Sequence, residues 1–284
     1  MIQELKIKNF LSFKEEVTFS FEATKDTFAE DIQVVEVAEG VRLLRFAMVY
    51  GANASGKSNL LEAFGFLHHF WFEKPDDMDE ETRVIPFKLD NLTPNEPSTF
   101  ELIFYVDSTK YWYQLELDEK QVYFEKLSYY KSVQPTMLFE RELKDSQSII
   151  TFNPAAVKIS SVAKEKMAVE CLKNMSFFAA RDKVNINIPI IDVAKEWIKN
   201  QIMPIVEPRT RMFQYAEKQM LKDKDIKSYL LDFVREADFN IVDVNTQTEK
   251  EEMPQKVVDS FLNSNTVAEQ EKEKIRKDPF FTTL

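Results

Sequence analysis

The chain opens with alternating apolar and polar side chains. Within residues 3–10, Leu5 and Ile7 alternate with lysines. A period of two places one set of side chains on a buried face, so this pattern predicts a half-buried β-strand. Two shorter runs, at residues 17–21 and 32–37, predict two further strands.

The next run is apolar almost throughout. Residues 43–50 read LLRFAMVY, which is typical of a strand buried on both faces. Residues 59–72 follow with apolar side chains at helical spacing. The pattern therefore predicts a buried strand, a short loop and an amphipathic helix in succession.

The middle of the chain predicts an antiparallel meander. Residues 73–97 are acidic and contain prolines, which predicts a loop with a brief strand near Phe87. Four alternating, aromatic-rich runs then recur at roughly ten-residue spacing, the interval typical of strands joined by tight turns. These runs are residues 99–106, 111–117, 122–130 and 136–143.

From residue 154 the pattern becomes helical, with a short strand predicted at 240–244. The four helices are predicted at residues 161–174, 190–206, 210–221 and 226–236. Residues 246–277 are strongly charged, which predicts a helical or mobile segment. We therefore expect an N-terminal lobe with the meander at 1–153, a helical subdomain at 154–245 and a charged linker or arm at 246–284.

Composition limits the class of protein. The 284 residues include 37 Lys and Arg against 48 Asp and Glu, a formal net charge of -11. This acidic balance argues against a protein that coats nucleic acid, although a local basic groove would be compatible with it. Cys171 is the single cysteine, which excludes a disulfide framework. No apolar run is long enough for a membrane span, and the predicted location is the cytoplasm.

Glycine is scarce, and its placement points to one loop. The chain has 4 glycines, whereas average usage would give roughly 20. Residues 51–58 read GANASGKS and fit G-x-x-x-x-G-K-[ST], the Walker A phosphate-binding loop. Its glycines let backbone N–H groups surround phosphates, its lysine reaches the β- and γ-phosphates, and its serine is placed to bind Mg²⁺. The predicted ATP-binding residues are Gly51, Ala52, Asn53, Ala54, Ser55, Gly56, Lys57, Ser58 and Asn59, with Ser58 also the magnesium ligand.

A second catalytic element is missing from the pattern. ATP-dependent motors need an Asp that positions Mg²⁺, and in many of them a neighbouring acid activates water. No apolar strand-like run in this sequence ends in Asp-Glu or Asp-Asp. The weak candidates are residues 188–192 (IPIID) and 241–243 (IVD). Pro189 interrupts the first, and a helical pattern follows it, so a structural role is favoured there.

Three segments resemble one group of bacterial ATP-binding proteins. They are the opening IQELKIKNFLSFKEEVTFSF, the junction RLLRFAMVYGANASGKSNLLEAF and the segment PFKLD…PSTFELIFYVD. Together they resemble AAA-type, ABC-like ATPases related to RecF, SMC proteins and OLD nucleases, several of which act in abortive phage defence. Asn53 and the NF-x-SF start are typical of that class. The resemblance extends from the first residue to about Val244.

The resemblance implies an incomplete head of ABC/SMC type. In that family, an α/β P-loop NTPase head folds from both ends of the chain, and two heads enclose ATP. The C-terminal part carries a Ser-Gly signature and the Asp-Glu element, called Walker B. No glycine follows Gly65, so nothing here matches the signature. The sequence therefore resembles the N-terminal portion of such an ATPase, with an antiparallel β subdomain and a helical C-terminal region.

Other candidate residues favour structural roles. His68 and His69 are the only histidines, too few for a predicted metal site, and Cys171 lies in an apolar helical pattern. An aromatic group in the meander could stack bases, although alternation favours a core. Its members are Trp112, Tyr113, Tyr123, Tyr129 and Tyr130. The scattered Lys6, Lys8 and Lys14 could line a DNA path but are explained as readily by solvated charges.

Three functions follow as hypotheses. The first is an ATPase that binds Mg²⁺–ATP and hydrolyses it only with the missing half. The second is a nucleotide-binding regulatory module whose ATP biases assembly with a partner. The third is a kinase-like phosphotransferase, which lacks the expected basic lid and is the weakest. The predicted partners are a second copy, the missing C-terminal half or an effector protein.

Overall fold

The computed structural model describes most of the chain. The described residues are 1–145, 147–207, 209–210, 212–237, 239–244, 249–252, 254–263, 272–273, 275–276 and 280–283. They fall into two compact units, Met1–Ile205 and Val206–Leu284. The first unit carries both the predicted sheet and the predicted phosphate-binding loop.

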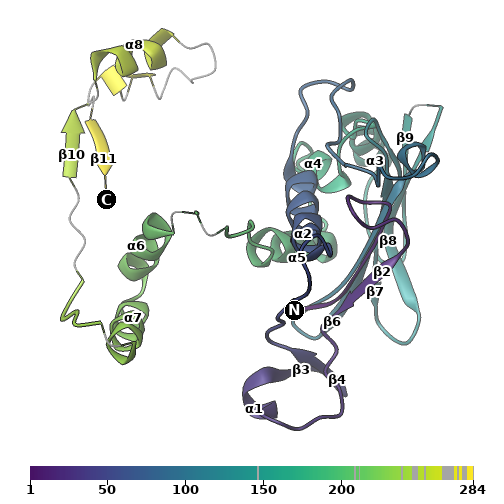
Figure 1. The fold of residues 1–284 in the computed structure, drawn as a ribbon. Coiled ribbons are helices and arrows are strands. Elements are labelled where there is room, and N and C mark those ends of the chain that lie inside the picture. The colour runs from purple at the N-terminus through teal and green to yellow at the C-terminus, as the bar shows by residue number, and fades with distance from the viewer. Residues whose placement is uncertain are drawn as a thin grey trace. The chain divides into compact units, whose positions relative to one another are not determined.

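A seven-stranded antiparallel sheet organises the first unit (Figure 1). Its order is β2-β1-β5-β6-β7-β8-β9. The strands are β1 (Ile2–Lys8), β2 (Val17–Ser20), β5 (Ser98–Val106), β6 (Thr109–Leu117), β7 (Val122–Tyr130), β8 (Pro135–Lys144) and β9 (Gln147–Phe152). The predicted meander is confirmed, and β9 is an additional strand that the sequence pattern did not identify.

Helices cover one face of this sheet. They are α2 (Lys57–Phe72), α3 (Ser161–Glu170), α4 (Phe177–Arg181) and α5 (Pro189–Gln201). Aromatic rings join three of them to the strands. Trp71 of α2 packs edge-on against Tyr113, Phe177 of α4 stacks on Phe139, and Trp197 of α5 stacks on Phe104. The alternating apolar side chains of the strands therefore form a core between the sheet and the helices.

A charged network is enclosed between the sheet and the segment before α4. Glu125 on β7 and Arg141 on β8 are register partners, and both side chains are 0% exposed. Their side chains are 3.2 Å apart, and the Glu125 carboxylate also accepts from Tyr113, Ser176 and the Phe177 N–H. Burial and the Glu125 charge raise the pKa of Tyr113 well above 10.0, so its phenol stays protonated and donates. Both oxygens of the Glu125 carboxylate therefore have hydrogen-bond partners.

The predicted strand at residues 43–50 is wrong beyond Leu44. β4 (Val41–Leu44) pairs with β3 (Val34–Ala38) in a separate hairpin preceded by the short helix α1 (Glu30–Gln33). Residues 46–50 form no strand, and Phe46, Met48 and Tyr50 are 67%, 72% and 88% exposed. A strand that is buried on both faces needs strands that pair with it and segments that cover each face. Among the described residues, none pairs with this segment.

Two smaller expectations also differ. The predicted strand near Phe87 is absent from its described loop, which instead holds a 3₁₀ turn at Thr93–Asn95. Residues 240–244 form no strand among the described residues. Near Phe87, prolines and polar turn residues outweigh a short apolar run, and at 240–244 the flanking polar residues do so.

The second unit is built from short elements. These are α6 (Phe213–Lys222), α7 (Lys224–Glu236), β10 (Glu249–Glu252), α8 (Gln255–Asn263) and β11 (Phe280–Thr283). Val258 is buried in α8, whereas Phe261 is exposed. The expectation for residues 246–277 falls partly outside the described residues, and the three-part division of the chain stays a prediction. No described helix is long and apolar enough to cross a membrane.

Candidate functional site

The Walker A sequence forms a tight loop at the start of α2. Residues 51–56 precede the helix, which begins at Lys57. Ala54 has a φ of 62° and Gly56 a φ of 90°, so the chain turns twice through the left-handed region. A side chain at Gly56 would be strained by its φ alone, which explains the glycine at this position.

Lys57 lies against its own loop. Its ammonium donates to the carbonyl oxygens of Gly51 at 3.0 Å and Ala52 at 2.7 Å. Both acceptors are neutral and the three residues lie at the surface or only partly buried. A phosphate oxygen is a stronger acceptor than a carbonyl, so the lysine can exchange these partners for an anion.

The loop also presents free backbone donors. The N–H groups of Gly56, Lys57 and Ser58 find no acceptor among the described residues, since the first helical bond joins the Leu60 N–H to the Gly56 carbonyl at 3.1 Å. Unpaired N–H groups at a helix start carry the positive end of the helix dipole. These donors lie within the sequence-predicted residues 51–59, and N–H groups at a helix start are of the kind that can bind an anion.

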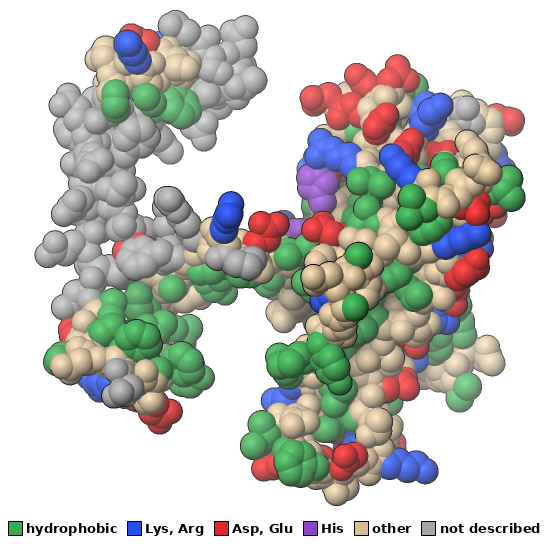
Figure 2. Space-filling model, viewed as in Figure 1, with side chains coloured by type: hydrophobic (Ala, Val, Ile, Leu, Met, Phe, Trp, Pro, Cys, Tyr) green, Lys and Arg blue, Asp and Glu red, His purple; other side chains and the backbone are tan. Residues whose placement is uncertain are grey.

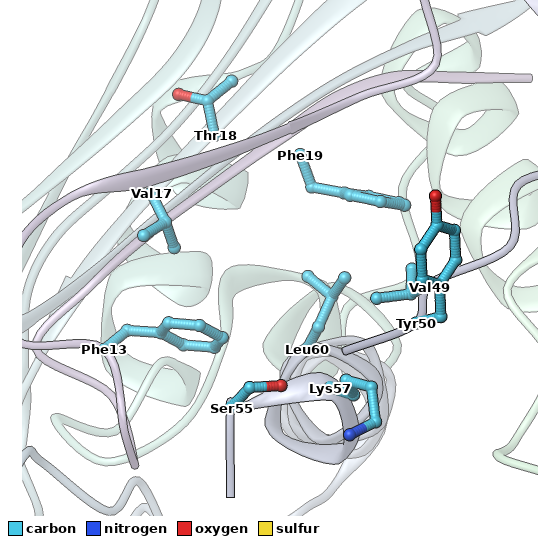
Figure 3. Close-up of a pocket in the computed structure, with 10 residues that line it drawn as sticks. Phe13, Val17, Thr18, Phe19, Val49, Tyr50, Ser55, Lys57 and Leu60 are labelled. Carbon is cyan, nitrogen blue, oxygen red and sulfur yellow. The ribbon is translucent and has the colours of Figure 1, made fainter. Parts of the chain in front are cut away.

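An apolar cavity of about 210 Å³ adjoins the loop (Figure 3). Val17 and Phe19 point into it from β2, and Phe13, Val49 and Tyr50 line it from other segments. Its loop side is formed by Ser55, Gly56, Lys57 and Leu60. A site with one apolar wall and one cationic, donor-rich wall suits a ligand that is flat and apolar at one end and anionic at the other.

The unpaired N–H groups and the Lys57 ammonium fit a phosphate group, and a bound phosphate would supply oxygen ligands for Mg²⁺. None of the residues that line this cavity is Asp or Glu. Among the described residues, no group of three or more His, Cys, Asp or Glu is arranged to hold a metal ion. Mg²⁺ is usually held by one or two protein oxygens together with substrate phosphates and waters, so the Ser58 hydroxyl is the fitting protein ligand.

The two weak candidates for the missing acid occupy other places. Residues 188–192 form the start of α5, with Pro189 at its first turn. There Asp192 accepts from the Ile188 N–H at 3.0 Å and pairs with Arg181 at 2.9 Å. The structural role expected for this segment is confirmed. In the second unit, Asp243 pairs with Lys227 at 3.0 Å.

The two histidines form a surface pair on α2, and both are visible in Figure 2. His68 packs edge-on against Phe72, and burial, with His69 beside it, lowers its pKa. His69 is exposed and lies 2.7 Å from Glu73. The expectation of a packed or surface pair is confirmed.

The aromatic group for which a core was favoured over base stacking is divided between two faces of the meander. Tyr113 and Tyr129 belong to the core, as alternation favoured. Trp112 and Tyr130 are partly buried and Tyr123 is exposed, on the opposite face. Of the three lysines, Lys14 pairs with Asp90 at 2.6 Å and Lys6 lies 3.7 Å from Glu4, and a DNA path stays a hypothesis.

Cys171 is buried, as expected, and its chemistry gives a testable prediction. Burial raises the pKa of its thiol to about 11, from 9.0 in the unfolded chain. The folded protein thus holds this proton more tightly, and the stability this contributes is complete below pH 9 and lost as the pH rises towards 11. We expect the free energy of unfolding to fall by about 1.4 kcal/mol per pH unit in that window.

Urea unfolding of the wild type and of Cys171→Ala, measured between pH 8 and pH 11, checks this expectation. The variant should lose less stability over the window than the wild type, because tyrosines and lysines titrate equally in both. Parallel curves for the two proteins would contradict it.

Comparison with known proteins adds one match. Residues 46–158 match the family model described as AAA domain, putative AbiEii toxin, Type IV TA system. The matched segment begins at the exposed run 46–50 and includes the loop, α2 and the meander. The similarity to AAA-type P-loop proteins that the sequence predicted is therefore confirmed for this segment. No curated protein matches the chain.

Proposed function

We propose, on the premise that residues 46–158 are an AAA-type P-loop domain, that the chain binds Mg²⁺–ATP at residues 51–59. One observation carries the proposal most directly. Three unpaired N–H groups at the start of α2 and the Lys57 ammonium meet beside an apolar cavity. Backbone donors and one mobile cation suit a polyphosphate, and the apolar wall suits a nucleobase.

Each residue has a separable role in this proposal. Lys57 leaves the carbonyls of Gly51 and Ala52 and donates to phosphate oxygens. Ser58 supplies its hydroxyl to Mg²⁺, which neutralises phosphate charge when bound. The aromatic side chains of Phe19 and Tyr50 lie on the apolar wall and exclude water from the base.

Hydrolysis requires groups that this site does not contain. Water must be oriented by a carboxylate or an equivalent polar group, and none of the cavity residues is acidic. The sequence also has no glycine after Gly65 with which to form a Ser-Gly signature. We therefore assign the chain to the RecF/SMC-like class as an ATP-binding protein whose hydrolysis depends on a complementary half.

We expect the isolated chain to bind Mg²⁺–ATP and to release phosphate very slowly, at about 10⁻³ s⁻¹ or less, as in phosphate loops without their activating groups. Calorimetric titration with Mg²⁺–ATP and a phosphate-release assay on the same preparation check both parts. Turnover near 1 s⁻¹ that is abolished by Lys57→Ala would contradict the proposal, because it would require an activating acid within this chain.

A second candidate function is regulation by assembly, which the exposed segment 46–50 favours. Its backbone has no hydrogen-bond partner among the described residues, and four large apolar side chains, those of Phe46, Met48, Val49 and Tyr50, are exposed next to the loop. Such a segment can accept a strand from a second protein. The family description names a toxin–antitoxin system, which supports a protein partner. A role in phage defence is part of this proposal.

We expect ATP to increase self-association or partner binding through this segment. Sedimentation of the chain with and without Mg²⁺–ATP should show a larger species with nucleotide, and Met48→Lys should abolish that species without lowering the unfolding temperature. Met78→Lys, at a residue that is 54% exposed in a remote loop, is the matched control. Equal association of all three proteins would exclude segment 46–50 as the contact.

A further inference from the structure

We propose that Asn9 is a positioning residue for the phosphate-binding loop, acting through the turn formed by residues 9–13. The proposal rests on the proposed nucleotide binding and names a residue outside the Walker A sequence. The turn belongs to the NF-x-SF segment, in which Phe10 packs into the core against Phe66 and Phe100.

The turn is tight and held in an unfavourable backbone conformation. Phe10 and Phe13 exchange two backbone hydrogen bonds, of 3.0 Å and 2.8 Å. Asn9 and Leu11 have φ values of 52° and 49°, in the left-handed region that favours glycine. Backbone strain of this kind persists only where surrounding contacts enforce it, and it concentrates at functional sites.

Asn9 supplies the enforcing contacts. Its side chain is buried at 0% exposure, and its amide donates to the carbonyls of Thr93 at 2.7 Å and Glu96 at 2.8 Å. Its amide oxygen accepts from the Phe87 N–H at 3.0 Å. One side chain thus joins the turn to three points of the loop before β5, a segment about 80 residues away in the sequence.

The opposite side of the turn contacts the phosphate-binding loop. A Cβ at Gly56 would lie 3.0 Å from the Ser12 hydroxyl and 3.4 Å from the Phe13 ring. Phe13 also lines the cavity beside Lys57. Gly56 carries one of the unpaired N–H groups, so a displacement of residues 12–13 moves both a donor and the cavity wall.

These contacts link Asn9 to ligand affinity. A loop that cradles phosphate must hold its N–H groups within a fraction of an ångström of their acceptors. Asn9 fixes the turn, and the turn restricts where Gly56 can lie. Removal of the Asn9 amide should therefore weaken nucleotide binding although Asn9 touches no ligand.

The test compares two buried asparagines in the 284-residue chain. Asn174 is 4% exposed and its amide donates to the carbonyls of Asp77 and Glu80, both at 2.9 Å, far from the loop in sequence. Asn174→Ala removes these two bonds, whereas Asn9→Ala removes its bonds to Thr93 and Glu96, a 3.4 Å bond to the Pro97 carbonyl and the bond accepted from the Phe87 N–H. We expect the Kd for Mg²⁺–ATP to rise about tenfold in Asn9→Ala and to stay within about twofold in Asn174→Ala, both measured at a temperature at which each variant is folded.

Asn9→Gly separates anchoring from backbone strain, because glycine accepts the φ of 52° without penalty but has no amide. The proposal expects weak binding in this variant too, and recovered affinity would overturn it. If Asn9→Ala does not fold, Ser98→Ala replaces it, since the Ser98 hydroxyl donates to the Asn9 carbonyl. That milder variant should bind about two- to threefold more weakly, and unchanged affinity would overturn the proposal.

The proposed nucleotide binding and the proposed role of Asn9 are contradicted by different results. A wild-type chain that binds no Mg²⁺–ATP would refute the proposed function, and this inference with it. A wild-type chain that binds while Asn9→Ala binds equally well would refute the positioning role alone.

Discussion

Glu125→Ala is expected to lower the free energy of unfolding by about 3–5 kcal/mol, the cost of leaving a buried charge without its partner. Arg141 would keep its bonds to the Leu172 and Met175 carbonyls and to Ser148, but its positive charge would have no counter-ion. The donors of Tyr113 and Ser176 would also lose their acceptor. Urea denaturation monitored by tryptophan fluorescence measures this loss.

A neighbouring ion pair provides the control. Lys126 and Glu140 occupy the next rung of the same two strands, 2.7 Å apart, on the partly exposed face. Glu140→Ala should cost about 0–1 kcal/mol, because water stabilises both charges there. Equal losses for the two variants would contradict the argument from burial. Replacing Glu125 and Arg141 together by Leu and Met should not restore full stability, since the surrounding polar groups would stay unpaired.

Lys57→Ala is expected to weaken Mg²⁺–ATP binding about 10- to 100-fold, the range for a lost hydrogen bond to a charged group. The folded state should not change, because Lys57 bonds only to two carbonyls of its own exposed loop. Calorimetric titration and the thermal unfolding midpoint, measured on the same protein, separate the two effects.

Lys88→Ala is the matched control for charge, since Lys88 is an exposed lysine whose nearest acid, Glu119, is 3.9 Å away. Its removal should leave ATP affinity unchanged. If Lys57→Ala bound ATP as tightly as the wild type, the loop would not be the nucleotide site. Loss of the folded state in Lys57→Ala would show instead that the lysine has a structural role.

The sequence correctly predicted those strands and helices whose pattern depends on residues that are close together in the chain. The alternation of Leu5 and Ile7 gave β1, and the turn residues between the aromatic runs gave the meander, because each pattern depends on neighbours in the chain. The Walker A pattern is recognisable for the same reason, and nucleotide binding there stays a prediction. Its glycines and lysine all lie within residues 51–57, and the conformation at Gly56 is a local requirement.

The failures concern contacts between distant residues. Apolarity at residues 46–50 predicted burial, yet burial depends on strands that the described residues do not provide. The sequence also did not indicate that Asn9 makes several hydrogen bonds. Its acceptors lie far away in the chain, at residues 93 and 96, and an isolated asparagine is common in turns. Glu125 and Arg141 were missed because charged residues rarely lie in a core.

The strand order has a consequence for folding during synthesis. Strands β5 to β9 pair with their sequence neighbours, so each hairpin can form as soon as its two strands leave the ribosome. β1 instead pairs with β5, and Asn9 bonds to residues 93 and 96, so β1 waits until about 90 further residues have been made. Residues 51–58 are therefore translated before β5, whereas the turn at residues 9–13 can become fixed only after the segment that leads into β5 has been made.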